Sequence, residues 1–401
     1  MSSNLKPEQT ALQTLDPPKS TLGVYGWLRK NLFNSFFNTL LTIISILVIY
    51  YILKGSITWV FTTAQWAVIT ENYRLFMVGQ YSSEQLWRVW TCLGLVSLLF
   101  GLSAGIWKGT IRNLSIVLII LYLVHTLVPF VSSTGKMWII INIGIVIIGY
   151  LTGPKIPKNK AITLVGWSLS FPLIIFLLNG FGVFPTVKTN IWGGLLLTLL
   201  ISIVAILVSF PIGILLALGR TSKLPIIKYF CILYIEIIRG IPLITVFFMA
   251  QIMIPLFLPE GFEINNVIRV MIGATLFTAA YMAENVRGGL QSIPQGQFEA
   301  AKAMGLNPVH SMAFIIMPQA LRAVIPAMVG QSISMFKDTT LVAIVGLIDL
   351  LGIAQTVKSN PEFLGRHMEV YVFIALVYWI IAYSMSYSSR RLEKSLGVGE
   401  R

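Results

Sequence analysis

Charged residues are scarce in this chain. Asp, Glu, Lys and Arg make up only 11% of its 401 residues, while hydrophobic residues make up 56%. A typical soluble protein carries about 25% charged residues. The composition therefore excludes an ordinary water-soluble domain, and lipid must act as the solvent for much of the surface.

Reactive and metal-binding residues are also few. The two cysteines, Cys92 and Cys231, lie in or beside apolar runs far apart in the sequence, which argues against a disulfide framework or a cysteine metal site. The chain has no Gly-x-x-x-x-Gly-Lys-Ser/Thr nucleotide-binding loop, no convincing catalytic triad and no metal-ligand cluster. We therefore expect no catalytic residue, metal or cofactor in this chain, and any energy source must lie outside it.

Long apolar runs are what the chain has in abundance. A run of about 20 apolar residues crosses a bilayer as a helix, which satisfies its own backbone groups in lipid. The short alternating segments of a membrane β-barrel are absent. The sequence predicts an all-α integral membrane protein with about ten transmembrane helices. They are expected near residues 34–53, 89–107, 113–131, 137–153, 162–180, 192–219, 226–257, 267–288, 319–338 and 369–389.

The basic residues fix an expected orientation. The net charge is +14, and Lys and Arg gather in short loops beside apolar runs. The positive-inside rule explains this distribution better than nucleic-acid binding does, so no nucleic-acid partner is expected. It predicts that the N-terminus and the C-terminus are both cytoplasmic. The segments Gly180–Asn190 and Glu260–Asn266 then face outward.

The chain divides into three expected parts. Residues 1–31 form a polar cytoplasmic tail without the apolar core of a signal peptide. Residues 32–184 hold accessory transmembrane helices, and residues 185–395 hold the remaining helices and every distinctive motif. Residues 54–88 are expected to form an external loop whose Trp and Tyr side chains rest at the membrane interface. No convincing internal repeat is present, which weakens an inverted-repeat secondary transporter.

A polar segment between two apolar runs, EAAKAMGLNPVHS from Glu299, predicts a helix, a sharp turn and a second helix near residues 294–317. Gly305 can adopt the left-handed conformation that ends a helix. Asn307 can cap the next helix and Pro308 fits its first turn. The predicted orientation places this hairpin in the cytoplasm. It is either a surface that contacts a partner or an ordinary amphipathic interfacial helix.

The seventh apolar run, residues 226–257, is too long for one plain span. Gly240 and Pro242 interrupt it, since proline removes a backbone donor and clashes with the preceding turn. Glu236 and Arg239 lie three residues apart just before this break. The four residues form either a structural bend or a hinge between two half-helices.

A second charged pair closes the eighth run. Glu284 and Arg287 are three residues apart and so share one face of a helix. Charged groups close to lipid are costly unless they are paired or hydrated. This pair is either a structural ion pair or part of a path that transmits motion.

Polar residues also interrupt the ninth run. About 20 residues from Pro318 traverse the bilayer, which puts Lys337 and Asp338 towards the external side. A Lys–Asp pair followed by Thr339 suits a zwitterion, but it can equally neutralise itself or anchor the helix at the interface. Gln331 and Ser334, with Ser332 beside them, either line the same route or form hydrogen bonds between helices.

Four motifs in residues 185–395 resemble the permease domain of polar amino-acid ABC importers, the histidine/glutamine permease family. They are EIIRGIPL, AYMAENVRGGLQSIPQGQFEAAKAMGL, IMPQALRAVIP and FKDTTL. The first half, with WLRKNLFNSFFNTLL and its tryptophan-bearing loop, is similar to the long permease subunit of general L-amino-acid importers. Met317 and Ile241 depart mildly from the common pattern.

This resemblance implies a five-helix type I ABC importer permease core in the C-terminal half. It implies ATP-driven, binding-protein-dependent import of amino acids by alternating access at the bacterial inner membrane. ATP and Mg would bind two separate ABC ATPase subunits, and the other partners would be a second permease, giving a heterodimer, and an external amino-acid-binding protein. The ATPase contacts it implies are Glu299, Ala300, Ala301, Gly305 and Leu306. The alternative is a secondary transporter driven by an ion gradient, which needs no ATPase.

Overall fold

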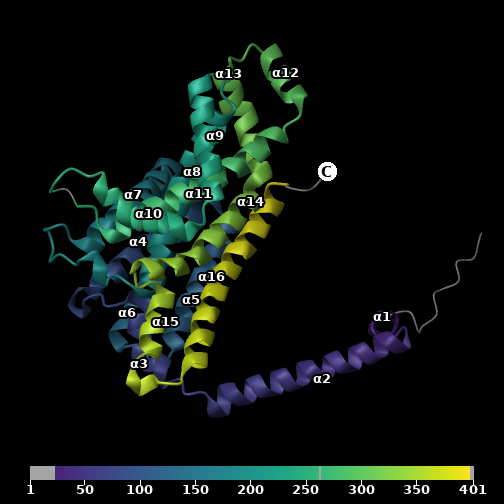
Figure 1. Ribbon diagram of the computed structural model, residues 1–401, viewed down its shortest axis with the longest axis vertical. Helices are drawn as coiled ribbons and strands as arrows, with labels where there is room; N and C mark the ends of the chain where they lie inside the picture. Colours follow the sequence, from purple (N-terminus) through teal and green to yellow (C-terminus); the bar gives the residue numbers. More distant parts are fainter. Residues whose placement is uncertain (1–22, 262, 398–401) are drawn as a thin grey trace, which may run out of the picture. The chain divides into compact units, whose positions relative to one another are not determined.

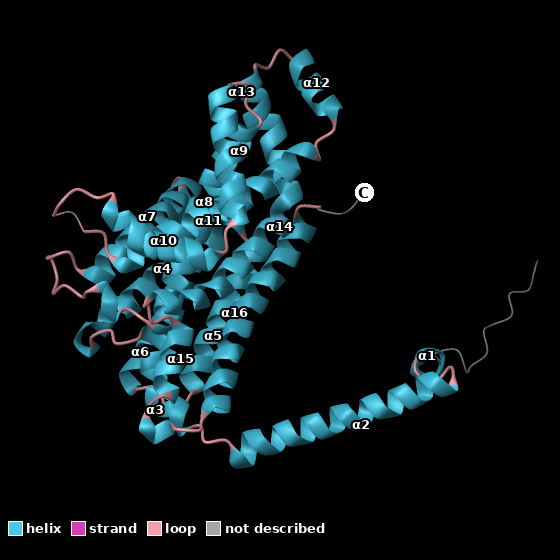
Figure 2. Ribbon diagram, in the orientation of Figure 1, coloured by secondary structure: helices cyan, strands magenta, loops and turns pink. Residues whose placement is uncertain are grey.

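The computed structural model describes residues 23–261 and 263–397. The chain forms two compact units, residues 1–65 and 66–401, and each is described by itself. Regular secondary structure in the described residues is helical throughout, with isolated β-bridges besides (Figure 2). Nine helices in this part of the chain are long and apolar enough to cross a membrane, or ten if the bent pair α9 (Pro225–Gly240) and α10 (Leu243–Leu256) counts as one span. The predicted all-α membrane protein is confirmed.

The first unit contains α1 (Gly23–Asn31) and α2 (Phe36–Thr58), which runs on into a π-helical turn. Ser35 begins α2 by accepting a hydrogen bond from the backbone N–H of Asn38. No residue of α2 is buried. Because this helix is apolar on every side, it requires lipid or another protein around it. Most of the predicted cytoplasmic tail, residues 1–22, lies outside the described residues.

The second unit begins with a helix that sequence analysis missed, α3 (Ala67–Val78). Val68, Ile69 and Phe76 are buried, and α3 packs against α8 (Gly194–Arg220) and α15 (Leu350–Lys358). The prediction of a loop is therefore wrong for this stretch, which is helical and packed against other helices. Twelve residues are too few for a span of about 20, so a search for membrane-length apolar runs passes over such a helix.

Four accessory helices follow, and α4 (Leu86–Trp107) contacts the other three. These are α5 (Gly109–Leu127), α6 (Ser133–Thr152) and α7 (Asn159–Asn179). Glycines let α4 and α6 approach closely, as small residues do in membrane helix pairs. A Cβ added at Gly101 would lie 2.3 Å from the carbonyl oxygen of Val146. α4 and α6 therefore form the tightly packed centre of the accessory region.

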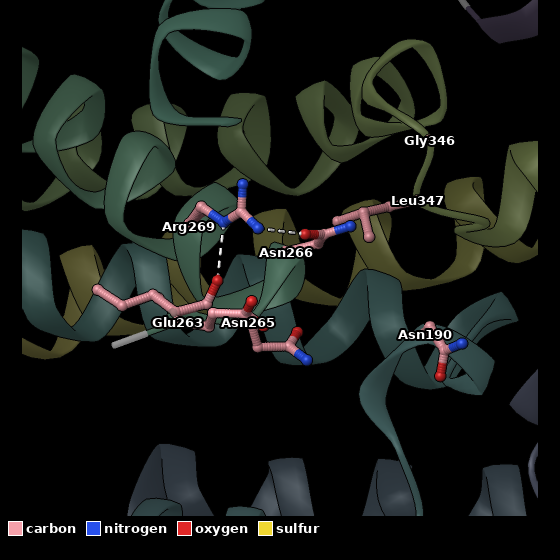
Figure 3. Close-up of a pocket in the computed structure, with 8 residues that line it drawn as sticks. Asn190, Glu263, Asn265, Asn266, Arg269, Gly346 and Leu347 are labelled. Carbon is pink, nitrogen blue, oxygen red and sulfur yellow. Dashed lines mark hydrogen bonds between the residues drawn. The ribbon is translucent and has the colours of Figure 1, made fainter. Parts of the chain in front are cut away.

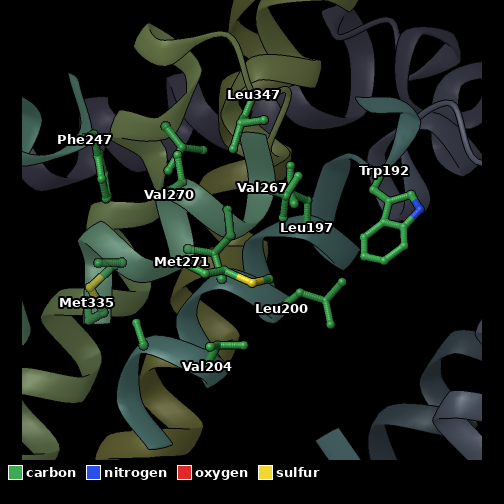
Figure 4. Close-up of a cluster of buried hydrophobic side chains, with 14 of the residues drawn as sticks. Trp192, Leu197, Leu200, Val204, Phe247, Val267, Val270, Met271, Met335 and Leu347 are labelled. Carbon is green, nitrogen blue, oxygen red and sulfur yellow. The ribbon is translucent and has the colours of Figure 1, made fainter. Parts of the chain in front are cut away.

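Four of the remaining helices, α8, α9, α10 and α14 (Met317–Asp338), pack against α11 (Asn266–Gln291) (Figure 1). In α11, 67% of the most apolar window is buried, the largest share among the candidate spans of the described chain. α8 packs along it, and α10 and α14 flank it. α16 (His367–Ser395) packs against α14 and α15. Figure 4 shows the main buried cluster, to which α8 contributes Leu197 and Leu200, α11 contributes Val270 and Met271, and α10 contributes Phe247.

Candidate functional site: an exposed hairpin and a charged cluster

The predicted hairpin, residues 294–317, is present at one end of the helices (Figure 1). Its first arm is α12 (Gln295–Ala303). Gly305 follows with φ +74°, and the backbone N–H of Leu306 donates to the carbonyl of Ala301 at 3.2 Å. Such bonds satisfy the open carbonyls at a helix end. The predicted turn at Gly305 is confirmed.

The second arm starts as predicted and then continues further. Asn307 accepts a hydrogen bond from the backbone N–H of His310 at 2.8 Å, and Pro308 occupies the first turn of α13 (Pro308–His310). A π-helical segment, Ser311–Ile316, then leads directly into α14. The helical run therefore extends from Pro308 to Val345 without a break. The second arm is the end of a membrane helix, not a separate element.

The hairpin exposes three of its five predicted contact residues. Glu299, Ala300 and Gly305 are exposed and Leu306 is half-buried, whereas Ala301 is only 4% exposed. Ala301 faces its own chain, because the tight turn folds the chain back over it. In this chain alone, Ala301 is therefore a buried position of the hairpin and not part of its exposed surface.

Large apolar side chains stand out on the same hairpin. Met304 is 81% exposed, Val309 74% and Phe314 68%. A polar segment with exposed apolar side chains at its tip is typical of a surface that another protein covers. Gln319 donates to Gln297 at 3.1 Å and so ties the first arm to the start of α14.

A cluster of five charged residues joins three helices near the base of the hairpin. Glu284 of α11 lies 2.8 Å from Arg287, 3.1 Å from Arg220 of α8 and 3.4 Å from Arg239 of α9. Glu236 of α9 lies 2.9 Å from Arg220. One carboxylate therefore holds three guanidinium groups, which offsets the cost of charge beside lipid.

The cluster confirms one expected pairing and adds a residue that sequence analysis missed. Glu284 and Arg287 pair along one helix face, as their spacing indicates. Glu236 and Arg239 share that spacing, but their ion pairs in the described structure run to Arg220 and Glu284. Arg220 is distant in sequence from both glutamates, so no local spacing could have found it.

The predicted break lies directly beside this cluster. α9 ends at Gly240, α10 begins at Leu243, and the two helices are bent by 109°. Pro242 precedes α10 in an extended conformation, with φ −59° and ψ 141°. A Cβ added at Gly240 would meet no atom within 4 Å. The predicted break is confirmed.

The polar residues of α14 do not all share one surface. Gln331, Ser334 and Asp338 follow helical spacing on one face, where Ser334 is exposed and the other two are half-buried. Lys337 is exposed on an adjacent face. Thr339 is fully buried and donates to the carbonyl of Phe336 at 2.7 Å. Its hydroxyl is already used within the chain.

A pocket of about 280 Å³ lies at the end of α11 that is opposite the hairpin (Figure 3). Asn190, Glu263 and Asn265 line it, so both segments predicted to face outward meet at this end. Arg269 lies at its centre, donating to the carbonyl of Ile264 at 2.8 Å and to the side chain of Asn266 at 2.6 Å. These bonds hold the rim of the pocket in place.

A buried acid, which sequence analysis also missed, holds α15 in position. Asp349 begins α15 by accepting a hydrogen bond from the backbone N–H of Gly352 at 2.9 Å. Tyr378 of α16 donates to its other oxygen at 3.3 Å. Burial raises the pKa of Asp349 to about 6. An Asp directly before a short apolar helix was the available signal.

Comparison with known proteins identifies relatives over nearly the whole chain. Residues 209–398 match the family of binding-protein-dependent transport system inner membrane components. The inner membrane amino-acid ABC transporter permease protein YhdY of Escherichia coli K12 is 38% identical over 93% of this chain and 93% of its own length. The glutamate/glutamine/aspartate/asparagine transport system permease protein BztC of Rhodobacter capsulatus is 36% identical over 94% of this chain and 95% of its own length.

A shorter relative helps to place the accessory region. The probable glutamine ABC transporter permease protein GlnP of Bacillus subtilis is 33% identical over 51% of this chain and 92% of its own length. The two long relatives therefore match nearly the whole chain, accessory region included, whereas GlnP matches only about half of it. The predicted resemblance to amino-acid ABC importer permeases is confirmed, and the chain is a multi-pass membrane protein with a role in transport rather than catalysis. It belongs to the family of binding-protein-dependent transport system inner membrane components.

Proposed function

We propose that this chain is a permease subunit that carries amino acids inward, driven by ATP hydrolysis on a separate subunit. The full-length similarity to YhdY, an amino-acid ABC transporter permease, is the observation that carries this proposal. BztC is named for glutamate, glutamine, aspartate and asparagine, so polar amino acids are the substrates to test first.

The hairpin is the proposed contact with the ABC ATPase, which binds ATP and Mg. Glu299 offers an exposed charge, and the exposed Ala300 and Gly305 let a partner approach the backbone closely. Met304 and Val309 offer apolar area that a partner would remove from water. Ala301 and Leu306 shape the turn that presents this surface.

Movement of the hairpin would reach the far side of the membrane through α14. The helical run from Pro308 to Val345 carries the hairpin at one end and Lys337 and Asp338 towards the other. The π-helical segment inside it is the place where such a run adjusts most easily. A push on the hairpin would therefore shift the proposed substrate route, on which Gln331 and Ser334 also lie.

The charged cluster would make the ends of α8, α9 and α11 that lie near the hairpin move together as one rigid block. Glu284 links α8, α9 and α11 through Arg220 and Arg239. A Cβ added at Gly289 of α11 would lie 2.6 Å from the carbonyl of Ala320, so α14 is also close-packed at this level. Helix α9 ends at Gly240, directly after Arg239, and α10 begins after Pro242. We place the hinge there, where α10 can change its angle to the block.

The proposed assembly holds two ATPase subunits, a second, different permease and an external amino-acid-binding protein. Lys and Arg in the loops on the hairpin side favour a cytoplasmic hairpin with both termini cytoplasmic. The pocket around Arg269 then faces outward, where the binding protein would dock. Lys337 and Asp338 offer one charge each to the carboxylate and ammonium of an amino acid.

The experiment is uptake into proteoliposomes that contain this chain with its co-purified subunits. Radiolabelled glutamate or glutamine should accumulate only when the binding protein is outside and ATP is inside. An ionophore should leave that uptake unchanged. Full uptake without the ATPase, or its abolition by the ionophore at constant ATP, would show that the chain is instead a secondary transporter.

A further inference from the structure

A cavity of about 870 Å³ lies between the first turn of α5 and the last turns of α16. Arg112 of α5 and Arg390, Arg391 and Lys394 of α16 line it, and no acidic residue does. All four basic side chains are exposed, and none forms an ion pair in the part of the chain that the structure describes. Four positive charges around one cavity, with no carboxylate among them, favour a bound anion.

The start of α5 adds backbone donors to this cavity. Lys108 and Gly109 both have positive φ, 52° and 56°, in the sharp turn that separates α4 from α5. Lys108 offers no side-chain cap, so the first N–H groups of α5 receive no side-chain acceptor from it. Gly109 and Thr110 line the cavity. A helix N-terminus attracts negative charge, and here it adds to the charge of the four basic side chains.

The cavity is formed at the ends of two candidate membrane spans, α5 and α16, where lipid headgroups are expected. Tyr383 and Tyr387 line it as well, and the guanidinium group of Arg391 lies 5.1 Å from the ring of Tyr387. Tyrosine and arginine near helix ends are typical of the membrane interface.

The exposed side chains further along both helices are apolar. On α5, Ile116 and Ile120 follow Arg112 at intervals of one turn and are 48% and 51% exposed. On α16, Trp379 and Leu376 precede Tyr383 and are 61% and 51% exposed. A ligand with a phosphate at one end and acyl chains at the other matches this order of charge and apolar surface.

We propose that this cavity, the α5–α16 cavity, binds the phosphate headgroup of an anionic membrane phospholipid. The lipid phosphate would neutralise the arginines, and its chains would lie along the apolar faces of α5 and α16. Because α5 is an accessory helix and α16 belongs to the region matched by the family, the lipid would join the two parts of the chain. Free inorganic phosphate has the same headgroup chemistry but leaves the apolar faces uncovered.

The test measures lipid binding to the purified full chain, so it does not depend on transport. Delipidated protein is titrated with short-chain phosphatidylglycerol, with short-chain phosphatidylcholine and with inorganic phosphate, and the shift of the thermal unfolding midpoint gives an apparent affinity. Phosphatidylglycerol should bind saturably, and the other two should have little effect. Native mass spectrometry should show phosphatidylglycerol retained when the protein comes from mixed phosphatidylglycerol–phosphatidylcholine vesicles.

A triple variant and a matched control locate the site. Arg390→Gln with Arg391→Gln and Lys394→Gln should bind phosphatidylglycerol at least about tenfold more weakly, since each basic residue near an anionic lipid surface contributes measurably. The control removes the same charge from the exposed Lys155, Lys158 and Lys160, which lie just before α7 and in its first turn. The end of α6 and the start of α5 are on the same membrane side, because one helical hairpin joins them. It should bind like the unaltered chain.

Three results would overturn the proposal. The triple variant could bind as well as the unaltered chain, or the lysine control could lose as much affinity as the triple variant, which would indicate only a general attraction to positive charge. Inorganic phosphate could also give the full saturable shift by itself, which would make this a site for a soluble anion. If the triple variant does not fold, phosphatidylglycerol binding is measured on two single variants, Arg112→Gln and Lys394→Gln. Each should bind phosphatidylglycerol more weakly than the unaltered chain.

Discussion

Gly305→Asp separates the contact role of the hairpin from its fold. Gly305 has φ +74°, and an added Cβ would meet no atom within 4 Å. An L-residue in the left-handed region costs roughly 1–2 kcal/mol, and Asp tolerates it better than most residues. The hairpin should therefore keep its shape. The added carboxylate would project from the proposed ATPase contact, where an unpaired buried charge costs several kcal/mol.

A loss of about 2–4 kcal/mol in association corresponds to roughly 30- to 1,000-fold weaker binding. The assay is co-purification of the ATPase with the tagged chain from its native membrane, followed by quantitative mass spectrometry. Membrane insertion and gel filtration of the variant should be unchanged. ATP-driven uptake should fall in parallel with the amount of bound ATPase.

Gly365→Asp is the matched control. Gly365 has φ +86°, is exposed and is equally open. It lies before the start of α16, at the end of the helices opposite the hairpin. Both variants add the same charge and the same backbone cost, so only Gly305→Asp should release the ATPase. Retained ATPase in a normally inserted Gly305→Asp chain, or equal loss in Gly365→Asp, would refute the assignment of the hairpin.

Three further predictions concern stability, each measured by thermal unfolding in detergent. Glu284→Gln should cost about 3 kcal/mol, because three guanidinium groups lose their shared charge partner; an unchanged midpoint would mean that the cluster is not structural. Asp349 is most stabilising when protonated, because its pKa is raised from 3.8 to about 6. The contribution of Asp349 to the free energy of unfolding is therefore fully present below about pH 4. It falls by about 3 kcal/mol in all as the pH rises to about 6 and above. Asp349→Asn, which retains the cap, should therefore remove this part of the pH dependence. Gly101→Ala should cost about 1–3 kcal/mol through the clash of its Cβ with Val146, whereas Gly144→Ala in the open part of α6 should cost nothing.

The features that sequence analysis predicted correctly are local. Apolar runs of membrane length identify the spans because the bilayer imposes that length. The turn at Gly305 and the cap at Asn307 follow from residue types within a few positions of each other. Gly240 and Pro242 mark the break between α9 and α10 for the same reason. In each case the physical cause lies within one or two helical turns.

The features it missed depend on tertiary packing. Arg220 reaches Glu236 and Glu284 only because α8, α9 and α11 converge. Residue spacing within one helix cannot predict a contact between different helices. α3 was missed because its twelve residues are too few for a membrane span, and the helices that bury its apolar residues, α8 and α15, are distant in sequence. The side chain of Ala301 turns inward because the chain folds back over it at Leu306. A motif match finds the residue but not the direction in which it points.

That distinction changes how the hairpin motif should be interpreted. The small residues of this motif have two different structural roles. Gly305 forms a left-handed turn in open space. Ala301 is buried, and a large side chain would not fit at its position. A larger residue at position 301 would therefore unfold the turn before it affected any partner, whereas a larger residue at position 305 would leave the turn standing. Loss of ATPase binding after substitution at Ala301 would say nothing about contact. Only the exposed positions, Glu299, Ala300 and Gly305, can report on the interface itself.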